Sequence, residues 1–261
     1  MAGSLYSLGS AVVSGGGGGG GAMTVVSVVD LDLTGLDSAS LSIGSNGLTK
    51  GGSAFATVVY GRASNPGGTA TAGPAGITIV GDPASTGGYG YVELDWSALV
   101  SGWDADWLET GYGVIVELVG IVGSYTSSSD NITLELGQIA GTGDGVRFYY
   151  ASATTHSFWA RRDSSDALVT ASTPLQAGDS VSVKVLLLGG QVGYAAHAVG
   201  SSPTVDLNAP TSGLQKTGAS YSATSTRRYG ASGAAVVATA MAGRRATYTW
   251  TALRVYRLEV A

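Results

Sequence analysis

Apolar residues recur at every second position in short runs from Tyr89 to the end of the chain, and Gly, Asp and Ser residues separate the runs. This alternation is typical of antiparallel strands that pack one side on a core and turn the other side to water. Many such strands joined by short turns indicate a β-sandwich or a β-barrel. The clearest runs are residues 92–96, 114–118, 132–136, 146–150 and 181–187.

The first third of the chain alternates less regularly. Valine and leucine alternate with two aspartates at positions 29–33, which places both aspartates on the outward side of a strand. Phe55, Thr57 and Val59 predict another strand. Residues 61–76 contain two prolines among many small residues, and we expect them to form a loop.

Two later segments lack a strand pattern. Residues 200–226 are rich in Ser, Thr, Gly and Pro, and we expect a long loop there. Loops of that length in a compact domain are usually functional, flexible or covered by a partner. Residues 96–108 predict a helical turn and no longer helix.

Three segments of the second half resemble the concanavalin A-like lectin and glucanase superfamily, which includes laminin G-like domains. Residues 175–200 are similar to that family's turn, long central strand, turn and return strand. Residues 227–233 resemble its short glycine-containing strand, and residues 248–260 resemble its closing strand, which pairs beside the first strand. The resemblance covers residues 89–260 and implies an all-β, antiparallel jelly-roll sandwich. It often implies glycan binding, but no particular activity.

The composition agrees with β structure and narrows the classes of partner. The chain has 42 glycines, no cysteine, 12% charged residues and a net charge of −5. With lysine only at positions 50, 184 and 216, we expect no broad cationic surface and no nucleic-acid binding. The absence of cysteine excludes disulfides, thiolate metal sites and cysteine nucleophiles, and it fits the reducing cytosol of a bacterium.

No segment has the pattern of a secretion signal or a membrane span. The first cationic side chain is Lys50, so the charged start of a secretory signal is missing. The most apolar run, residues 114–122, is too short to span a bilayer and contains Glu117. We therefore expect a soluble protein that is made without a signal peptide and does not insert into membranes.

One pair of carboxylates resembles the catalytic strand of the superfamily's glucanases. Those enzymes carry Glu-x-Asp-x-x-Glu or a form one residue longer, and Glu93 and Asp95 match the first two positions. Alternation places both on one face of a strand, which we expect to meet water. The third position is Ala98, or Leu99 in the longer form, and neither can act as the acid/base of glycoside hydrolysis. We therefore predict no catalytic residues and no enzyme activity.

A short acidic and aromatic segment is the candidate glycan site. Trp103 and Trp107 flank Asp104 and Asp106 in the sequence WDADW. Indole rings stack on sugar rings, and paired aspartates can hold Ca²⁺ through oxygen ligands. The alternative is an acidic loop whose indoles pack on the edge of the sandwich.

Histidine and arginine complete the candidate chemistry. His156 and His197 fall in different expected strands, so we predict no metal site, no Ser-His-Asp triad and no cofactor. Ten arginines occur against three lysines, several of them in pairs, and arginine is favoured at protein interfaces. Each pair either contacts a partner or lies in a solvated turn. The arginines that we select as partner contacts are Arg227, Arg228, Arg244 and Arg245.

The N-terminus carries seven consecutive glycines at positions 15–21, behind a short apolar segment. Ordering seven glycines costs on the order of 7–14 kcal/mol of backbone entropy, which contacts with a partner would have to offset. We divide the chain into an anchoring arm, residues 1–21, and one jelly-roll domain, residues 22–261. The arm residues expected to bind the partner are Leu5, Tyr6, Leu8, Val12 and Val13.

An anchored sandwich without cysteine, signal peptide or catalytic group resembles the accessory proteins of tailed bacteriophage particles. Our first hypothesis is a structural virion protein, either a capsid decoration (head-fibre) protein or a tail-fibre component, made in the host bacterial cytoplasm. Its partners would be other virion proteins and further copies of itself, with a homotrimer favoured. The alternative is a carbohydrate-binding module or adhesin that recognises cell-surface glycans.

Overall fold

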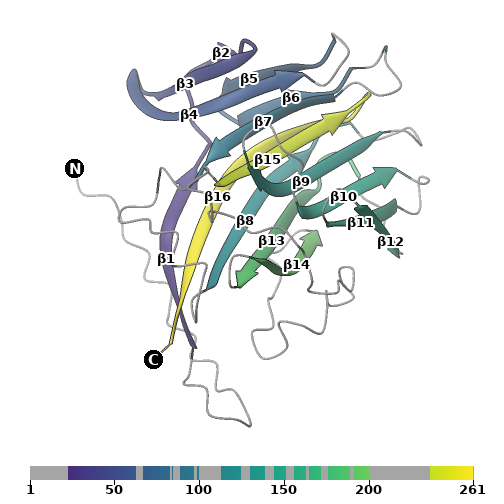
Figure 1. Cartoon of the computed structure of the whole chain (residues 1–261). Helices are drawn as coiled ribbons and strands as arrows, with labels where there is room; N and C mark the ends of the chain where they lie inside the picture. Colours follow the sequence, from purple (N-terminus) through teal and green to yellow (C-terminus); the bar gives the residue numbers. More distant parts are fainter. Residues whose placement is uncertain are drawn as a thin grey trace.

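The computed structural model describes residues 23–62, 67–82, 84, 89–96, 99, 113–124, 130–138, 144–150, 156–162, 165–171, 176–188, 191–199 and 236–260. Within these residues the chain forms two antiparallel β-sheets that pack face to face (Figure 1). The protein is therefore an all-β sandwich, one of the two architectures that the alternating pattern indicates, and it has the jelly-roll form that the resemblance implies.

Sheet A contains the first and the last strand of the described chain. Its strand order is β14-β13-β8-β16-β6-β5-β2, and β1 also pairs with β16. The strands are β1 (Met23–Asp32), β2 (Ala39–Ser40), β5 (Thr69–Gly73), β6 (Gly76–Val80), β8 (Gly113–Val122), β13 (Ser180–Leu188), β14 (Gln191–Val199) and β16 (Thr247–Val260).

Sheet B has the order β12-β11-β10-β9-β15-β7-β4-β3. The chain passes repeatedly between the sheets, so that β15, late in the sequence, lies between β9 and β7. This winding is what makes the sandwich a jelly roll. The strands are β3 (Gly44–Lys50), β4 (Ser53–Arg62), β7 (Tyr89–Asp95), β9 (Asn131–Gln138), β10 (Asp144–Tyr150), β11 (His156–Arg162), β12 (Ser165–Ala171) and β15 (Val236–Gly243).

The long closing strand β16 organises sheet A. One of its edges pairs with β8, and the other pairs first with β6 and then, from Ala252 onward, with β1. Met23 lies opposite Val260, so the two strands run antiparallel along the whole of β1 (Figure 1). A bulge at Thr251 separates the two partners, and there the indole N–H of Trp250 donates to the Ala252 carbonyl at 2.9 Å. The predicted pairing of the closing strand with an early strand is confirmed.

The core lies between the sheets and is built from the apolar members of the alternating runs. Alternate residues of runs 92–96, 114–118, 132–136 and 181–185 are buried as predicted. The described core positions of β15 are alanines, at 238, 240 and 242, and β15 packs against β16, which contributes the fully buried Tyr248 and Trp250. Small side chains on one strand thus leave room for large ones on the other, as dense packing requires.

Two expectations for the early chain are wrong in part. Residues 69–80 form the β5–β6 hairpin, although we predicted a loop over 61–76. Ala70 and Ala72 are the buried positions of β5, and alanine is too weak a hydrophobic signal to mark a strand by itself. Strand β4 exists as predicted, but its buried core positions are Val58 and Tyr60, while Phe55 is partly buried against the same core and Thr57 is exposed.

The segments similar to the lectin superfamily are present where the structure describes them. Strands β13 and β14 form the predicted hairpin, and β16 is the predicted closing strand. Residues 227–233, the expected loop 200–226 and the arm lie outside the described residues. Of the predicted helical turn, residues 96–108, the structure describes only Trp96 and Leu99, and there the Leu99 N–H donates to the Trp96 carbonyl at 3.1 Å.

Candidate functional site

Most of the residues selected from the sequence lie outside the described part of the chain. This holds for the tryptophans and aspartates of the glycan segment, for the arm residues and for one arginine pair, and their roles stay predictions. The residues concerned are Trp103, Asp104, Asp106, Trp107, Leu5, Tyr6, Leu8, Val12, Val13, Arg227 and Arg228.

The described arginine pair lies in the turn that joins the two sheets. Arg244 has a φ of 53°, in the left-handed region that side chains rarely adopt. Arg245 is exposed, and its backbone N–H lies 3.3 Å from the carboxylate of the buried Asp130, which accepts the hydrogen bond. The buried Asp130 thus stabilises the backbone of the turn, while the Arg245 side chain faces solvent. The role of Arg244 and Arg245 as partner contacts stays a prediction.

The histidines lie apart. His156 is on β11 in sheet B, and His197 is on β14 in sheet A. Among the described residues no group of three or more His, Cys, Asp or Glu side chains is placed to hold a metal ion. Nor does the described part of the chain contain a helix long and apolar enough to cross a membrane.

Glu93 and Asp95 lie on the same side of β7, opposite the core residues Val92 and Leu94, as alternation predicts. The expectation that both meet water is wrong for Glu93, which is 4% exposed, whereas Asp95 is partly buried. Strand β7 lies inside sheet B between β4 and β15, so side chains of both neighbouring strands flank Glu93 on this side of the sheet. We call this outward side of β4, β7, β15 and β9 the polar face.

The polar face brings a second glutamate into line with Glu93. Thr239 on β15 pairs with Glu93 on one side and with Glu135 of β9 on the other. Thr239 and Glu135 are 4% and 3% exposed. Strands in a sheet lie about 4.7–4.9 Å apart, so the backbones at the two glutamates are roughly 10 Å apart. We call these three residues the carboxylate row.

Analysis of the sequence missed Glu135 and Thr239 as site residues. Both are polar members of alternating runs, and that pattern assigns them to the solvent side of a strand. Only the insertion of β15 between β7 and β9 places them beside Glu93. The available signal was Glu135 itself, an acidic residue within the strongly apolar run NITLEL.

An aromatic ring adjoins the carboxylate row. Gly61 and Tyr91 are register partners, and a Cβ atom on Gly61 would lie 2.1 Å from the Tyr91 ring, so the ring lies across this glycine. Burial, and then the neighbouring Glu93 and Tyr89, raise the pKa of the Tyr91 hydroxyl. The polar face therefore combines a flat, partly buried ring, carboxylates and a hydroxyl. These are the groups that hold a sugar by stacking and by hydrogen bonds to its hydroxyls.

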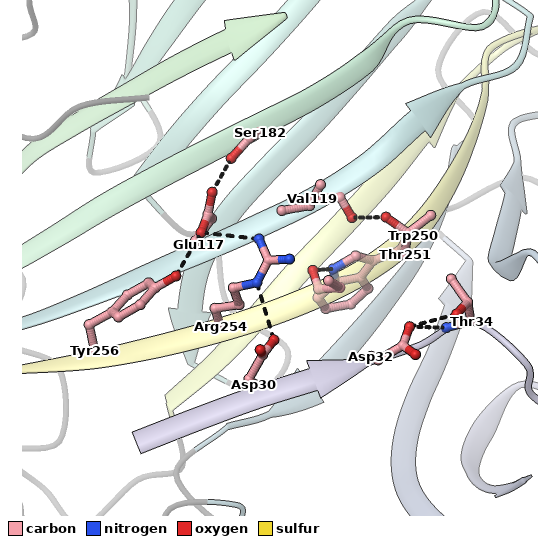
Figure 2. A network of polar contacts seen from close by, with 11 residues as sticks. Asp30, Asp32, Thr34, Glu117, Val119, Ser182, Trp250, Thr251, Arg254 and Tyr256 are labelled. Atoms are coloured by element: carbon pink, nitrogen blue, oxygen red, sulfur yellow. Dashed lines mark hydrogen bonds and ion pairs between the residues drawn. The ribbon is translucent and has the colours of Figure 1, made fainter. Parts of the chain in front are cut away.

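Sheet A carries a second polar cluster on its side away from the core (Figure 2). Asp30 of β1 pairs with Arg254 of β16, Arg254 with Glu117 of β8, and Glu117 with Lys184 of β13. Acidic and basic residues thus alternate in one register row across four strands. We call this row the charge ladder.

Glu117 is the centre of the charge ladder and is completely buried. Its Oε1 accepts a hydrogen bond from the Ser182 hydroxyl at 2.6 Å, and its Oε2 accepts one from the Tyr256 hydroxyl at 3.1 Å. Arg254 Nη1 lies 3.4 Å from the same Oε2, while its Nε lies 3.1 Å from Asp30 Oδ1 (Figure 2). One guanidinium therefore ties β1 to β8 across β16.

The outer members of the charge ladder complete its charge balance. The Lys184 ammonium lies 5.7 Å from the centre of the Tyr256 ring, within the range of a cation–π contact. Burial lowers the pKa of Lys184, and Glu117 partly opposes that shift. Two acids and two bases compensate one another within the protein. This geometry indicates a structural role: the charge ladder stabilises the register of the four strands. In the sequence, Glu117 had served only as an argument against a membrane span.

We expect Tyr256 to make the fold sensitive to alkali. Burial, followed by Glu117, raises the pKa of Tyr256 well above its ordinary value of 10.0. As the pH rises past the ordinary pKa of 10.0, the unfolded chain loses the phenolic proton of Tyr256 while the folded chain keeps it. The free energy of unfolding therefore falls as the pH rises. Urea denaturation between about pH 9 and pH 11 should show a shallower decline for Tyr256→Phe.

The comparison with Tyr256→Phe isolates this residue from others that titrate nearby. Tyr248, whose buried hydroxyl makes no hydrogen bond, adds a decline of the same sign, and Lys184 acts in the opposite direction below 10.5. At neutral pH the variant should be less stable by about 1.5–3 kcal/mol, because it loses a hydrogen bond to a buried carboxylate. Parallel declines in the two proteins would contradict the assignment.

No protein-family model matches this chain, and no curated protein matches it. Solved structures similar to it include a protein of unknown function from Shewanella oneidensis MR-1, with 12% identity and a TM-score of 0.40, covering 91% of this chain and 79% of that one. The seed lectin of Lotus tetragonolobus has 10% identity and a TM-score of 0.43, covering 85% and 98%. The CBM2 module of the evolved Dit of Lactobacillus casei BL23 phage J-1 has 14% identity and a TM-score of 0.35, covering 90% and 96%.

Proposed function

We propose that the sandwich binds saccharides on the polar face of sheet B. The observation that carries the proposal is the partly buried Tyr91 ring, which lies across Gly61 on the same side of β7 as the partly buried Asp95 and beside the carboxylate row. Carboxylates accept hydrogen bonds from sugar hydroxyls, and a tyrosine ring contacts the apolar face of a pyranose. Rigid strands hold these groups, which limits the entropy lost on binding.

The burial of each side chain decides whether it can contact a ligand directly. Tyr91 and Asp95 are partly buried and offer atoms to a ligand, whereas Glu93 and Glu135 are almost completely buried. We assign ligand contact to Tyr91 and Asp95, and we assign Glu93 a positioning role beside the tyrosine. The predicted loop residues Trp103 and Trp107 are a separate candidate surface for the same class of ligand.

We propose binding without cleavage. The strand that carries Glu93 and Asp95 has Ala98 or Leu99 where the related glucanases carry their acid/base, and neither side chain can exchange a proton. Incubation with β-glucans should release no reducing ends. A release that disappears in Glu93→Gln would overturn this part of the proposal.

Tyr91→Ala is expected to weaken saccharide binding by about tenfold, or roughly 1.4 kcal/mol, because it removes the stacking surface. A glycan array identifies the ligand, and titration calorimetry with that glycan compares the variants. The matched control is Tyr89→Ala, a tyrosine at the start of the same strand that pairs with Gly243 rather than lying over Gly61. If Tyr91→Ala binds normally and the double variant Trp103→Ala with Trp107→Ala does not, the loop and not the sheet is the binding surface.

We propose as a second function that the chain is a structural protein of a tailed-bacteriophage virion, made in the host cytoplasm, that displays this sandwich. The supporting observation is that β1 begins at Met23, two residues after the last glycine of the tract, and is tied into sheet A by Arg254. An arm attached in this way can hold the sandwich to a capsid or tail protein without contributing to its core. The exposed Arg245 and the predicted pair Arg227 and Arg228 then serve as contacts between copies.

Assembly as a homo-oligomer, with a trimer favoured, belongs to this second proposal. It rests on the few charged residues of the chain, 12% of the total, and on the preference of arginine over lysine at interfaces. Native mass determination of the purified chain gives the number of copies directly. A monomer at all concentrations would remove the oligomer from the proposal and leave anchoring by the arm to be tested separately.

A further inference from the structure

Strand β1 is the point where any force on the arm enters the sandwich. It follows the arm directly and pairs with β16 through nine register pairs, from Met23 with Val260 to Asp32 with Ala252. Its first residue and the last residue of β16 therefore lie at the same end of the sheet, as Figure 1 shows. The other end of β16 follows the turn that contains Arg245.

The direction of the force decides how the nine β1–β16 register pairs are loaded. Hydrogen bonds between antiparallel strands run perpendicular to the strands. When β1 and β16 are pulled from opposite ends along their axes, all nine pairs are sheared together. When both strands are pulled from their shared end, the pairs open one after another, starting with Met23 and Val260.

The charge ladder adds resistance when β1 and β16 are pulled from opposite ends (shear), but not when they are pulled from their shared end (peeling). Asp30 lies near the far end of β1, two residues before the strand ends, and Arg254 bridges it to the buried Glu117. In shear this bridge is loaded together with the backbone ladder. In peeling it is reached only after the pairs from Met23 to Ser27 have already opened.

We infer that β1 is a direction-dependent clamp. It resists force that enters through the arm and leaves at the opposite end of the sandwich, and it yields to force between the arm and the C-terminal end of β16. The inference rests on the proposed anchoring by the arm, because an anchored display protein is pulled in the first direction.

Single-molecule pulling of the full chain tests the clamp, and the absence of native cysteine makes the attachment points unique. The shear pair is Ser14→Cys with Arg245→Cys, whose handles lie before β1 and at the start of β16. The peeling pair is Ser14→Cys with Ala261→Cys, whose handles lie at the shared end. We expect a several-fold higher unfolding force for the shear pair, and equal forces would overturn the inference.

Two further variants test the part played by the charge ladder. Asp30→Asn removes the exposed end of the Arg254 bridge, and we expect it to lower the shear force while leaving the peeling force unchanged. Ser27→Ala on the same strand is the matched control and should change neither force. An unchanged shear force in Asp30→Asn would assign the resistance to the backbone ladder alone and remove the charge ladder from the clamp. None of these measurements needs the particle, so failure of the clamp is distinguishable from failure of anchoring.

Discussion

Deletion of residues 1–21 is expected to abolish attachment of this chain to its particle while leaving the sandwich folded. The first described strand begins at Met23, and every described core residue lies beyond it, so the deletion removes no described strand and no described core side chain. The arm carries the apolar residues that we assign to the partner, and the glycines behind them allow close approach to its surface. The truncated protein should therefore lose attachment to the particle but keep its folded sandwich.

The experiment mixes the truncated protein with particles that lack their own copy and measures co-sedimentation. Full-length chain is the positive control, and its urea midpoint should match that of the truncated protein. A second variant, Leu5→Asp with Leu8→Asp, keeps the arm at full length but removes its apolar character, and it should also fail to bind. Co-sedimentation of the truncated protein at the level of the full chain would show that the arm is not the anchor.

Replacement of Glu117 by alanine is expected to lower the free energy of unfolding by about 3–6 kcal/mol, because the buried carboxylate accepts two hydrogen bonds worth about 1.5–3 kcal/mol each. Glu117 is fully buried and receives hydrogen bonds from Ser182 and Tyr256 as well as the Arg254 contact. Alanine would leave the buried Ser182 hydroxyl without its acceptor and would remove the acceptor of the partly buried Tyr256 hydroxyl. Chemical denaturation, analysed for its midpoint and slope, measures the loss.

Two controls separate this effect from a general sensitivity of sheet A. Asp30→Asn removes the other carboxylate bound by Arg254, but the Asp30 side chain is 61% exposed, and exposed ion pairs contribute at most about 1 kcal/mol. The double variant Glu117→Leu with Arg254→Met replaces the buried pair by apolar groups and should recover part of the stability. A loss in Glu117→Ala no larger than in Asp30→Asn would contradict the structural role of the charge ladder.

The alternating pattern predicted the strands and their core sides wherever apolar residues are large. Runs 92–96, 114–118, 132–136 and 181–187 all form strands, and the closing strand lies beside β1 as expected. Local alternation suffices here because the pleat of a strand turns successive side chains to opposite faces. Where the buried residues are alanines, as in β5, the pattern was too weak and a loop was predicted instead.

Alternation in the sequence thus predicted the β class, most strands and, for the runs of large apolar residues after Tyr89, the face that enters the core. The sequence did not determine which polar side chains are buried, because burial depends on whether a strand is central or at an edge of its sheet. Glu93, Glu135 and Glu117 are all buried on the sides that alternation assigned to solvent. Their partners come from strands far along the chain: Arg254 is 137 residues from Glu117 and 224 from Asp30. Only the long-range pairing of β7, β15 and β9, and of β1, β16, β8 and β13, aligned the carboxylate row and the charge ladder, and no local pattern encodes that alignment.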